Sequence, residues 1–242
     1  MKKSFKLFLL ALCAVFACLA FTGCSNPTTT PEPTVTYIGT KTPTETKAVG
    51  DIVFTDGSAS PYTEELTNEQ KVAAIAVIFY VGDENDTLGA KTLGVGLITE
   101  RTDCRGLQWC LSDAVAYDSW DYAKNMDDGK ANTDEIAGLS DYGDGTKYPA
   151  FKFCRDYTAK GFTTNWYLPA YNELKMLYAS LTEVGNALNS LDIENPYTDF
   201  FLSSTSEYKD YNWAKVFHFT EEEHIQFMLK FIHVYVCAIH TF

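Results

Sequence analysis

Apolar and polar stretches alternate along the chain and predict an ordered series of elements. Residues 50–57, 74–82 and 92–99 are apolar and rich in β-branched side chains, which is typical of buried strands. Thr67 and Gln70 have the spacing of a capping box, so a short helix should begin there. Residues 113–147 are acidic and rich in glycine and tyrosine, and we expect a long irregular insertion.

Two further helices and a terminal run of strands are predicted in the second half. Residues 148–161 have helical periodicity, with a proline near the start and a glycine at the end. In 165–178, NWYLPAYNELKMLY, the apolar residues after Pro169 recur at helical spacing, which predicts a helix of about thirteen residues. We interpret this stretch as a brace of the fold. Residues 200–207, 213–220, 225–232 and 234–242 are expected to be strands.

The N-terminus has the pattern of an export signal. Three lysines precede an apolar run that is too short for a comfortable membrane span. The run ends in LAFTGC, which resembles the lipobox of bacterial lipoproteins, in which the cysteine is lipidated and becomes the new N-terminus. The resemblance implies a signal peptide over residues 1–23 and lipidation of Cys24. Ser25 is similar to the residue found in lipoproteins sent to the outer membrane. An ordinary secretory signal with an incidental cysteine is the alternative.

Composition adds a tether and a strong negative charge. Residues 24–49 are rich in Thr and Pro and nearly devoid of large apolar side chains, so we expect a disordered spacer before a globular domain at residues 50–242. The formal net charge is −13, and removal of the signal leaves 16 basic against 32 acidic side chains. Such a surface repels nucleic acid and anionic lipid, so neither is expected as a partner.

Candidate chemistry is sparse. Cys104 and Cys110 are close enough in sequence for a small-loop disulfide, although buried free thiols fit equally well. Antiparallel pairing could bring His218 near His240 and allow a zinc site, but no ligand spacing supports one. The acidic glycine loops of 125–135 and 141–147 could serve calcium, but they lack the EF-hand spacing. We therefore expect no metal, no cofactor and no catalytic residue.

The ordered segments resemble a known family. DIVFTDG, AVIFYVG, WYLPAYNEL, FLSSTSEY and the terminal VCAIHTF are similar to the bacterial surface-lipoprotein domains of the Lcl C-terminal type, which are common in spirochaetes. The resemblance covers nearly all of residues 50–242. It implies a C-type-lectin-like fold of the formylglycine-generating-enzyme variety: an α+β domain with few helices, mixed antiparallel strands that meet at the termini, and long irregular loops that form a binding face.

Departures from the family pattern limit what can be carried over. Ala170 stands where the family has Ser or Thr, and Ile239–His240 replace the usual Arg region near the end. If that Arg pairs with the motif Glu in the family, Glu173 is expected to be unpaired or solvated here. The late cysteine pair that binds copper in formylglycine-generating enzymes is absent, so oxidase activity is not expected.

These observations predict a lipid-anchored, non-catalytic binding module of the bacterial envelope, on the outer membrane and exposed at the surface. Its ligand would be a protein or a glycan, and the membrane is contacted only through the lipid. An aromatic and polar loop is the candidate binding site, because rings supply contact area and polar groups supply orientation. An envelope enzyme acting on glycan or protein, and a purely structural lipoprotein, are the alternatives. The loop consists of Tyr208, Lys209, Asp210, Tyr211, Asn212 and Trp213.

Overall fold

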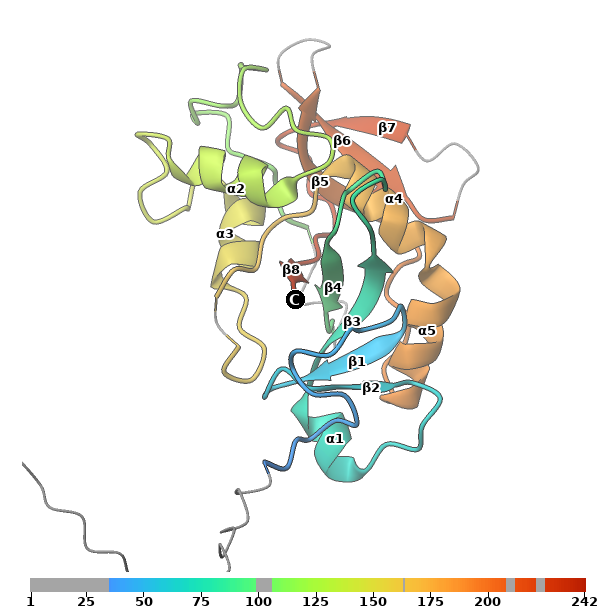
Figure 1. The fold of residues 1–242 in the computed structure, drawn as a ribbon. Helices are drawn as coiled ribbons and strands as arrows, with labels where there is room; N and C mark the ends of the chain where they lie inside the picture. The colour runs from blue at the N-terminus through green and yellow to red at the C-terminus, as the bar shows by residue number, and fades with distance from the viewer. Residues whose placement is uncertain (1–34, 99–105, 163, 208–211, 221–224) are drawn as a thin grey trace, which may run out of the picture. The chain divides into compact units, whose positions relative to one another are not determined.

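Two antiparallel sheets organise the part of the chain that the structure describes (Figure 1). The structure is a computed structural model that describes residues 35–98, 106–162, 164–207, 212–220 and 225–242. The larger sheet has the strand order β2-β1-β3-β4-β8 and the smaller has β5-β6-β7. The strands are β1 Asp51–Phe54, β2 Ala59–Pro61, β3 Ala74–Val81, β4 Thr92–Gly96, β5 Phe200–Glu207, β6 Trp213–His218, β7 Ile225–Leu229 and β8 Ile239–Thr241.

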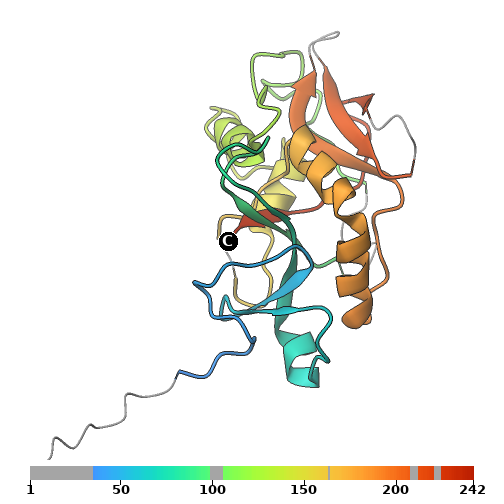
Figure 2. The ribbon, with the colours of Figure 1, turned by 45° about the vertical axis from the view of Figure 1, so that its right-hand side comes forward.

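The helices lie outside the sheets, and strand β3 of the larger sheet contributes side chains to two apolar clusters. The helices are α1 Asn68–Ala73, α2 Gly129–Ala137, α3 Pro149–Asp156, α4 Tyr171–Ala179 and α5 Leu181–Ser190. Figure 2 shows α4 and α5 following one another along one side of the molecule. One cluster contains Val77 of β3 with Leu177 of α4, and the other contains Ile75 with Phe151 of α3. Strand β3 is therefore buried on both faces, as its continuous apolar run predicts.

The α+β class with few helices and antiparallel strands is confirmed, and several individual elements agree with the sequence. Strands β1, β3, β4, β5, β6 and β7 each fall within a segment expected to be a strand. Thr67 accepts a hydrogen bond from the Gln70 N–H at 3.1 Å, and the Gln70 side chain accepts one from the Thr67 N–H, which is the expected capping box. The terminal strands β1 and β8 belong to the same sheet, but β3 and β4 lie between them.

Several elements differ from expectation: strand β2 was not predicted, and α4 has nine residues instead of about thirteen. Helix α2 forms inside the segment expected to be irregular, and it begins because the Asp128 carboxylate accepts a hydrogen bond from the Ala131 N–H at 2.9 Å. Helix α5 was not predicted at all. The expected strand over 234–242 is shortened to β8, because the preceding residues make isolated bridges to Leu107 and Phe201 instead of a continuous ladder.

Residues 36–49, which we expected to belong to the tether, pack against the domain. The contact unit runs from Thr36 to Phe242. Lys41 pairs with Ala59 through two backbone hydrogen bonds of 2.8 and 3.0 Å, and its ammonium group contacts the buried Asp51 carboxylate at 2.5 Å. Backbone pairing and an ion pair attach this segment to the domain. Because these contacts need few apolar residues, the composition of the segment did not indicate that it packs. Residues 1–34, including the expected signal peptide and Cys24, lie outside the described residues.

Candidate functional site

The predicted binding loop connects β5 and β6 at one end of the smaller sheet. Tyr208, Lys209, Asp210 and Tyr211 lie outside the described residues. Asn212 and Trp213 are described, and both are half-buried. The Asn212 carbonyl accepts a hydrogen bond of 2.8 Å from the Lys230 N–H, and Trp213 pairs with Leu229 of β7. The described end of the loop is therefore continuous with the β6–β7 hairpin.

A cation lies between two rings on the face of the hairpin beside α4. The Lys215 ammonium group lies 4.7 Å from the centre of the Phe227 ring and 5.7 Å from that of Tyr171. Lys215 and Phe227 are paired across β6 and β7, so their side chains share one face. Tyr171 is buried, whereas Phe227 is 37% exposed. An exposed ring next to a cation can contact both apolar and anionic parts of a ligand.

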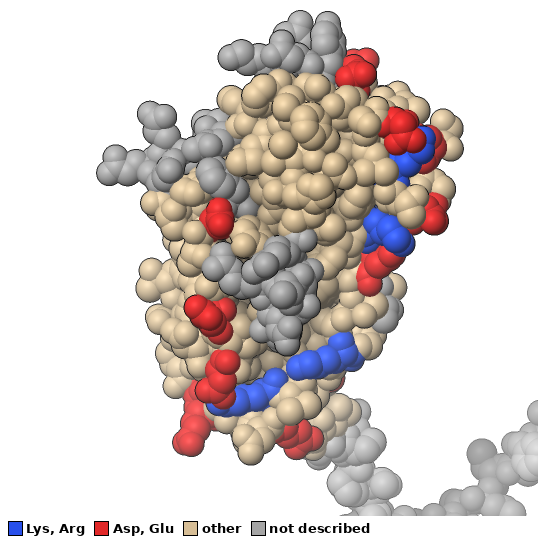
Figure 3. Space-filling view, turned by 180° about the vertical axis from the view of Figure 1, so that it is seen from behind, with Lys and Arg blue, Asp and Glu red and all other residues tan. Residues whose placement is uncertain are grey.

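Exposed apolar side chains continue around the end of β7. Phe231 and Ile232 are 37% and 39% exposed. Ile232 also lines a cavity of about 290 Å³ together with Met228 and Tyr235. Seen from behind, the upper part of the molecule has a broad area without charged side chains, and the acidic and basic residues gather around its margins (Figure 3). We call the exposed group of Phe227, Phe231 and Ile232 the β7 patch.

The β7 patch was missed at the sequence level. The apolar residues of 225–232, which follow a polar turn, correctly predicted a strand, but they did not reveal which side chains would remain in solvent. A signal was present, because strand β7 reads IQFML and carries no charged residue. Edge strands of soluble proteins usually carry a charge, a proline or a bulge that discourages pairing. An apolar strand segment without any charged residue, in a strongly acidic chain, was therefore the available indication.

A buried lysine fixes the end of β7. The Lys230 side chain is fully buried, and its ammonium group donates hydrogen bonds of 2.7 Å to the Ala116 carbonyl and 2.8 Å to the Ser119 carbonyl. It also lies 4.5 Å from the centre of the Trp109 ring. Burial lowers the pKa of Lys230 to about 8. These contacts attach the hairpin to the irregular segment around residues 116–119, so the β7 patch has a fixed support.

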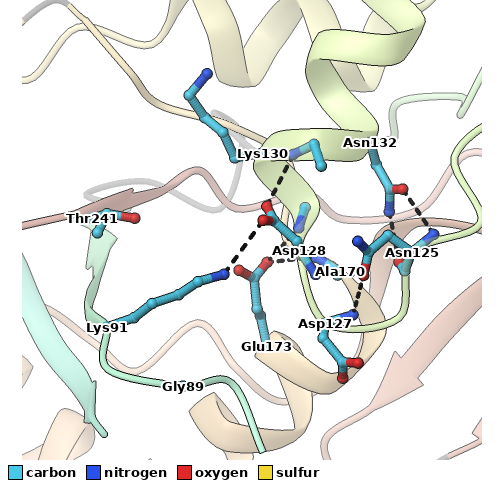
Figure 4. Close-up of polar contacts among 12 residues, drawn as sticks. Gly89, Lys91, Asn125, Asp127, Asp128, Lys130, Asn132, Ala170, Glu173 and Thr241 are labelled. Carbon is cyan, nitrogen blue, oxygen red and sulfur yellow. Dashed lines mark hydrogen bonds and ion pairs between the residues drawn. The ribbon is translucent and has the colours of Figure 1, made fainter. Parts of the chain in front are cut away.

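A second polar cluster joins the starts of α2 and α4 (Figure 4). The fully buried Glu173 carboxylate accepts hydrogen bonds from the Ala170 N–H at 2.7 Å, the Gly129 N–H at 3.1 Å and the Tyr167 hydroxyl at 3.1 Å. Ala170 has no side-chain oxygen, so Glu173 supplies the acceptor at the start of α4. The expectation that Glu173 would be unpaired or solvated is wrong, because backbone donors from two helices take the place of the missing Arg.

Neighbouring charges complete this cluster. The Lys91 ammonium group lies 3.5 Å from the Asp128 carboxylate, and Asp128 caps α2. Burial raises the pKa of Glu173 to about 7, although its hydrogen-bond donors and Lys91 favour the ionised form. Since Glu173 is sealed from solvent, a substrate has no access to its carboxyl group. The cluster is a structural junction, which agrees with the interpretation of 165–178 as a brace.

The remaining sequence-level candidates lie apart from one another. His218 is on β6 of the smaller sheet and His240 is on β8 of the larger, so strand pairing does not bring them together. The described residues contain no group of three or more His, Cys, Asp or Glu that could hold a metal ion. In the acidic loop 125–135, which was weighed as a calcium site, Asp127 accepts a hydrogen bond of 2.6 Å from Asn172, and Asp134 pairs with Lys130.

The cysteines within the described ranges are buried. Cys110 is buried and Cys104 lies outside the described residues, so the Cys104–Cys110 disulfide stays a prediction. Burial raises the pKa of the Cys110 thiol to about 12. Within the described ranges, each helix is too short or too polar to cross a bilayer.

Comparison with known proteins identifies a shared fold. No family model and no curated protein matches the sequence. Among solved structures, the chain is similar to a fimbrial protein from Bacteroides ovatus, with a TM-score of 0.58 and 18% sequence identity. The similarity covers 81% of this chain and 49% of the fimbrial protein, so the chain spans about half of that protein's length. At this identity the similarity concerns the α+β fold alone.

Proposed function

We propose that this protein is a lipid-anchored, non-catalytic binding module of the bacterial envelope, adhesin-like in role. Lipidation of Cys24 would anchor it in the outer membrane, and the Thr/Pro-rich segment would lift the domain from the lipid surface. The lipobox resemblance supports the anchor, since acyl chains hold a protein at a membrane without a spanning helix. The partner would be a protein or a glycan outside the membrane.

One observation carries the binding role. Phe227, Phe231 and Ile232 are each more than one-third exposed within and just after β7, and Ile232 also lines a cavity, in a chain whose net charge is −13. Several large apolar side chains exposed around one strand can mark a contact with another molecule, because their exposure to water is unfavourable. Trp213, the last residue of the predicted loop, pairs with Leu229 of β7.

The fold comparison supports a surface role, and the family resemblance supports the fold class. A fimbrial protein is a surface component by its name, and a similar fold agrees with a surface role for this chain. The resemblance to Lcl C-terminal-type lipoproteins favours the C-type-lectin-like class, in which irregular loops form the binding face. We therefore propose membership of that class as part of the same hypothesis.

The proposal can be tested with an array of glycans and of envelope and host proteins. The mature chain should bind at least one component, and replacing Tyr208, Tyr211 and Trp213 together by Ala should abolish that binding. Val72→Ala is the matched control, because Val72 is an apolar side chain that is 70% exposed on α1. Absence of any binding would favour a structural lipoprotein, and turnover of an array component would favour an enzyme. Binding unchanged by the triple substitution would remove the loop from the site.

A further inference from the structure

Three of the four sheet edges are covered by other parts of the chain. The outer edge of β2 is covered by Lys41, which exchanges two backbone hydrogen bonds with Ala59. The outer edge of β8 is covered in the same way by Tyr167, which exchanges two with Ile239 at 3.0 Å each. Along β5, the Ser204 N–H donates to the Pro169 carbonyl and the Ser206 N–H to the Ala123 carbonyl, both at 2.8 Å. The fold therefore leaves few strand edges open.

The outer edge of β7 is different. The Lys230 N–H donates to the Asn212 carbonyl, and the β6–β7 register continues from this pair without a bulge. Because antiparallel strands alternate between bonded and non-bonded pairs, Gln226 and Met228 direct their backbone groups toward β6. Phe227 and Leu229 direct theirs outward. The Leu229 carbonyl accepts a hydrogen bond of 2.8 Å from Ile232, whereas the Phe227 N–H and carbonyl have no partner among the described residues.

An added strand at this edge could place its side chains against protein side chains on both faces of the sheet. Successive residues of a strand point to opposite faces, so Phe227 and Met228 lie on different sides of the sheet. The Phe227 side offers an exposed ring next to Lys215. The Met228 side offers the cavity of about 290 Å³ that Ile232 also lines. No charged residue or proline occurs within β7, so the usual devices that prevent strand addition are absent from it.

We propose that β7 binds an extended polypeptide segment of a partner protein, which adds to the smaller sheet as a fourth strand beside Phe227. This inference rests on the proposed binding function and names its partner class. Main-chain hydrogen bonds to Phe227 would supply affinity, and the two faces would select alternating apolar side chains. A neutral or basic segment fits better than a second copy of this chain, because two copies would each bring a net charge of −13.

The direct test is amide hydrogen exchange of the mature protein with a defined probe. The probe is a short synthetic peptide in which Val and Thr alternate between terminal lysines. When nine-tenths of the protein is bound, exchange of the Phe227 amide should slow about tenfold, because only the free fraction exchanges. The Met228 amide points toward β6 and is the internal control, so its exchange should not change. An unchanged Phe227 rate at saturating peptide would overturn the inference.

Variants separate backbone pairing from side-chain contact. Phe227→Pro removes an outward N–H and leaves the β6–β7 ladder intact, so it should fold and lose the peptide. Phe227→Ala keeps that N–H and should retain weaker binding. If Phe227→Pro does not fold, two N-methylated peptides take its place. One carries methyl groups on its odd-numbered amides and the other on its even-numbered amides. Only the peptide whose methyl groups point away from β7 should bind. Equal binding of both peptides would refute strand addition.

The same experiments distinguish this inference from the proposed function. One outcome would refute strand addition and leave the binding function intact. In it, a protein or glycan from the array still binds Phe227→Pro but no longer binds after the loop substitutions at Tyr208, Tyr211 and Trp213. Failure of every array component, together with an unprotected Phe227 amide, would refute both.

Discussion

Replacing Glu173 by Gln should remove a pH dependence of stability that the wild-type fold carries. The Glu173 carboxyl is buried between the starts of α2 and α4, where burial raises its pKa to about 7 from a reference value of 4.5. A raised pKa of an acid means that the folded state prefers the protonated form. The stabilisation is therefore complete below the unfolded pKa and is lost as the pH rises through the folded pKa.

The size of this effect follows from the shift. One pKa unit corresponds to about 1.4 kcal/mol, so the shift of Glu173 corresponds to about 3 kcal/mol in all, of which about 2.5 kcal/mol should be lost between pH 5 and pH 8. Gln has the shape of the protonated acid and does not titrate. The free energy of unfolding of Glu173→Gln relative to wild type should therefore rise by that amount over the same interval.

The assay is urea unfolding of wild type and Glu173→Gln at pH 5 and at pH 8. Comparing the two proteins at each pH cancels the other titrating groups. Glu69→Gln, which removes an exposed acid on α1, is the matched control for the loss of one negative charge. A difference between wild type and Glu173→Gln that is the same at both pH values would refute the account of a carboxyl governed by burial.

Three further predictions concern packing, thiol chemistry and the anchor. Gly129→Ala should lower the free energy of unfolding by about 2 to 3 kcal/mol in urea titrations, because a Cβ there would collide with the Leu168 carbonyl and lie 2.7 Å from Glu173 Oε2. Gly138→Ala, at the other end of α2, has room for a Cβ and should not be destabilising to this extent. The Cys110 thiol is buried and has a pKa of about 12, so it should resist alkylation at pH 8 until urea unfolds the protein. Mass spectrometry can follow the labelling, and rapid labelling of the folded protein would contradict the burial of Cys110. Mass spectrometry of the mature N-terminus should show a lipidated Cys24, and an unmodified residue would remove the anchor.

Strong local patterns made much of the fold predictable. The continuous β-branched run of β3, the Thr67–Gln70 capping box and the turn-bounded β-like segments of β5, β6 and β7 each specify an element through nearby residues. Helix α2 could not be found in this way, because its buried residues other than Ile136 are small or polar and its support comes from Glu173, which is distant in the sequence. The packing of residues 36–49 likewise depends on pairing with Ala59 and Asp51.

The candidate site was predictable only in part. Sequence pattern indicated an aromatic loop that ends at Trp213, and Trp213 pairs with Leu229 of β7, whereas Tyr208 and Tyr211 lie outside the described residues. The pattern could not indicate that β7 is an edge strand or that Phe227 faces outward, because both depend on which strands pair. Glu173 was misjudged for a similar reason: its donors come from two helix starts that the sequence does not place side by side.

The central claim is that this protein binds a partner through the surface around β7. The most direct measurement compares wild type, Phe227→Ala and Val72→Ala on the array of glycans and proteins. Phe227 and Val72 are both exposed apolar residues, but only Phe227 belongs to the β7 patch. We predict that Phe227→Ala weakens binding of the wild-type partner and Val72→Ala does not. Equal binding by all three proteins would contradict the claim.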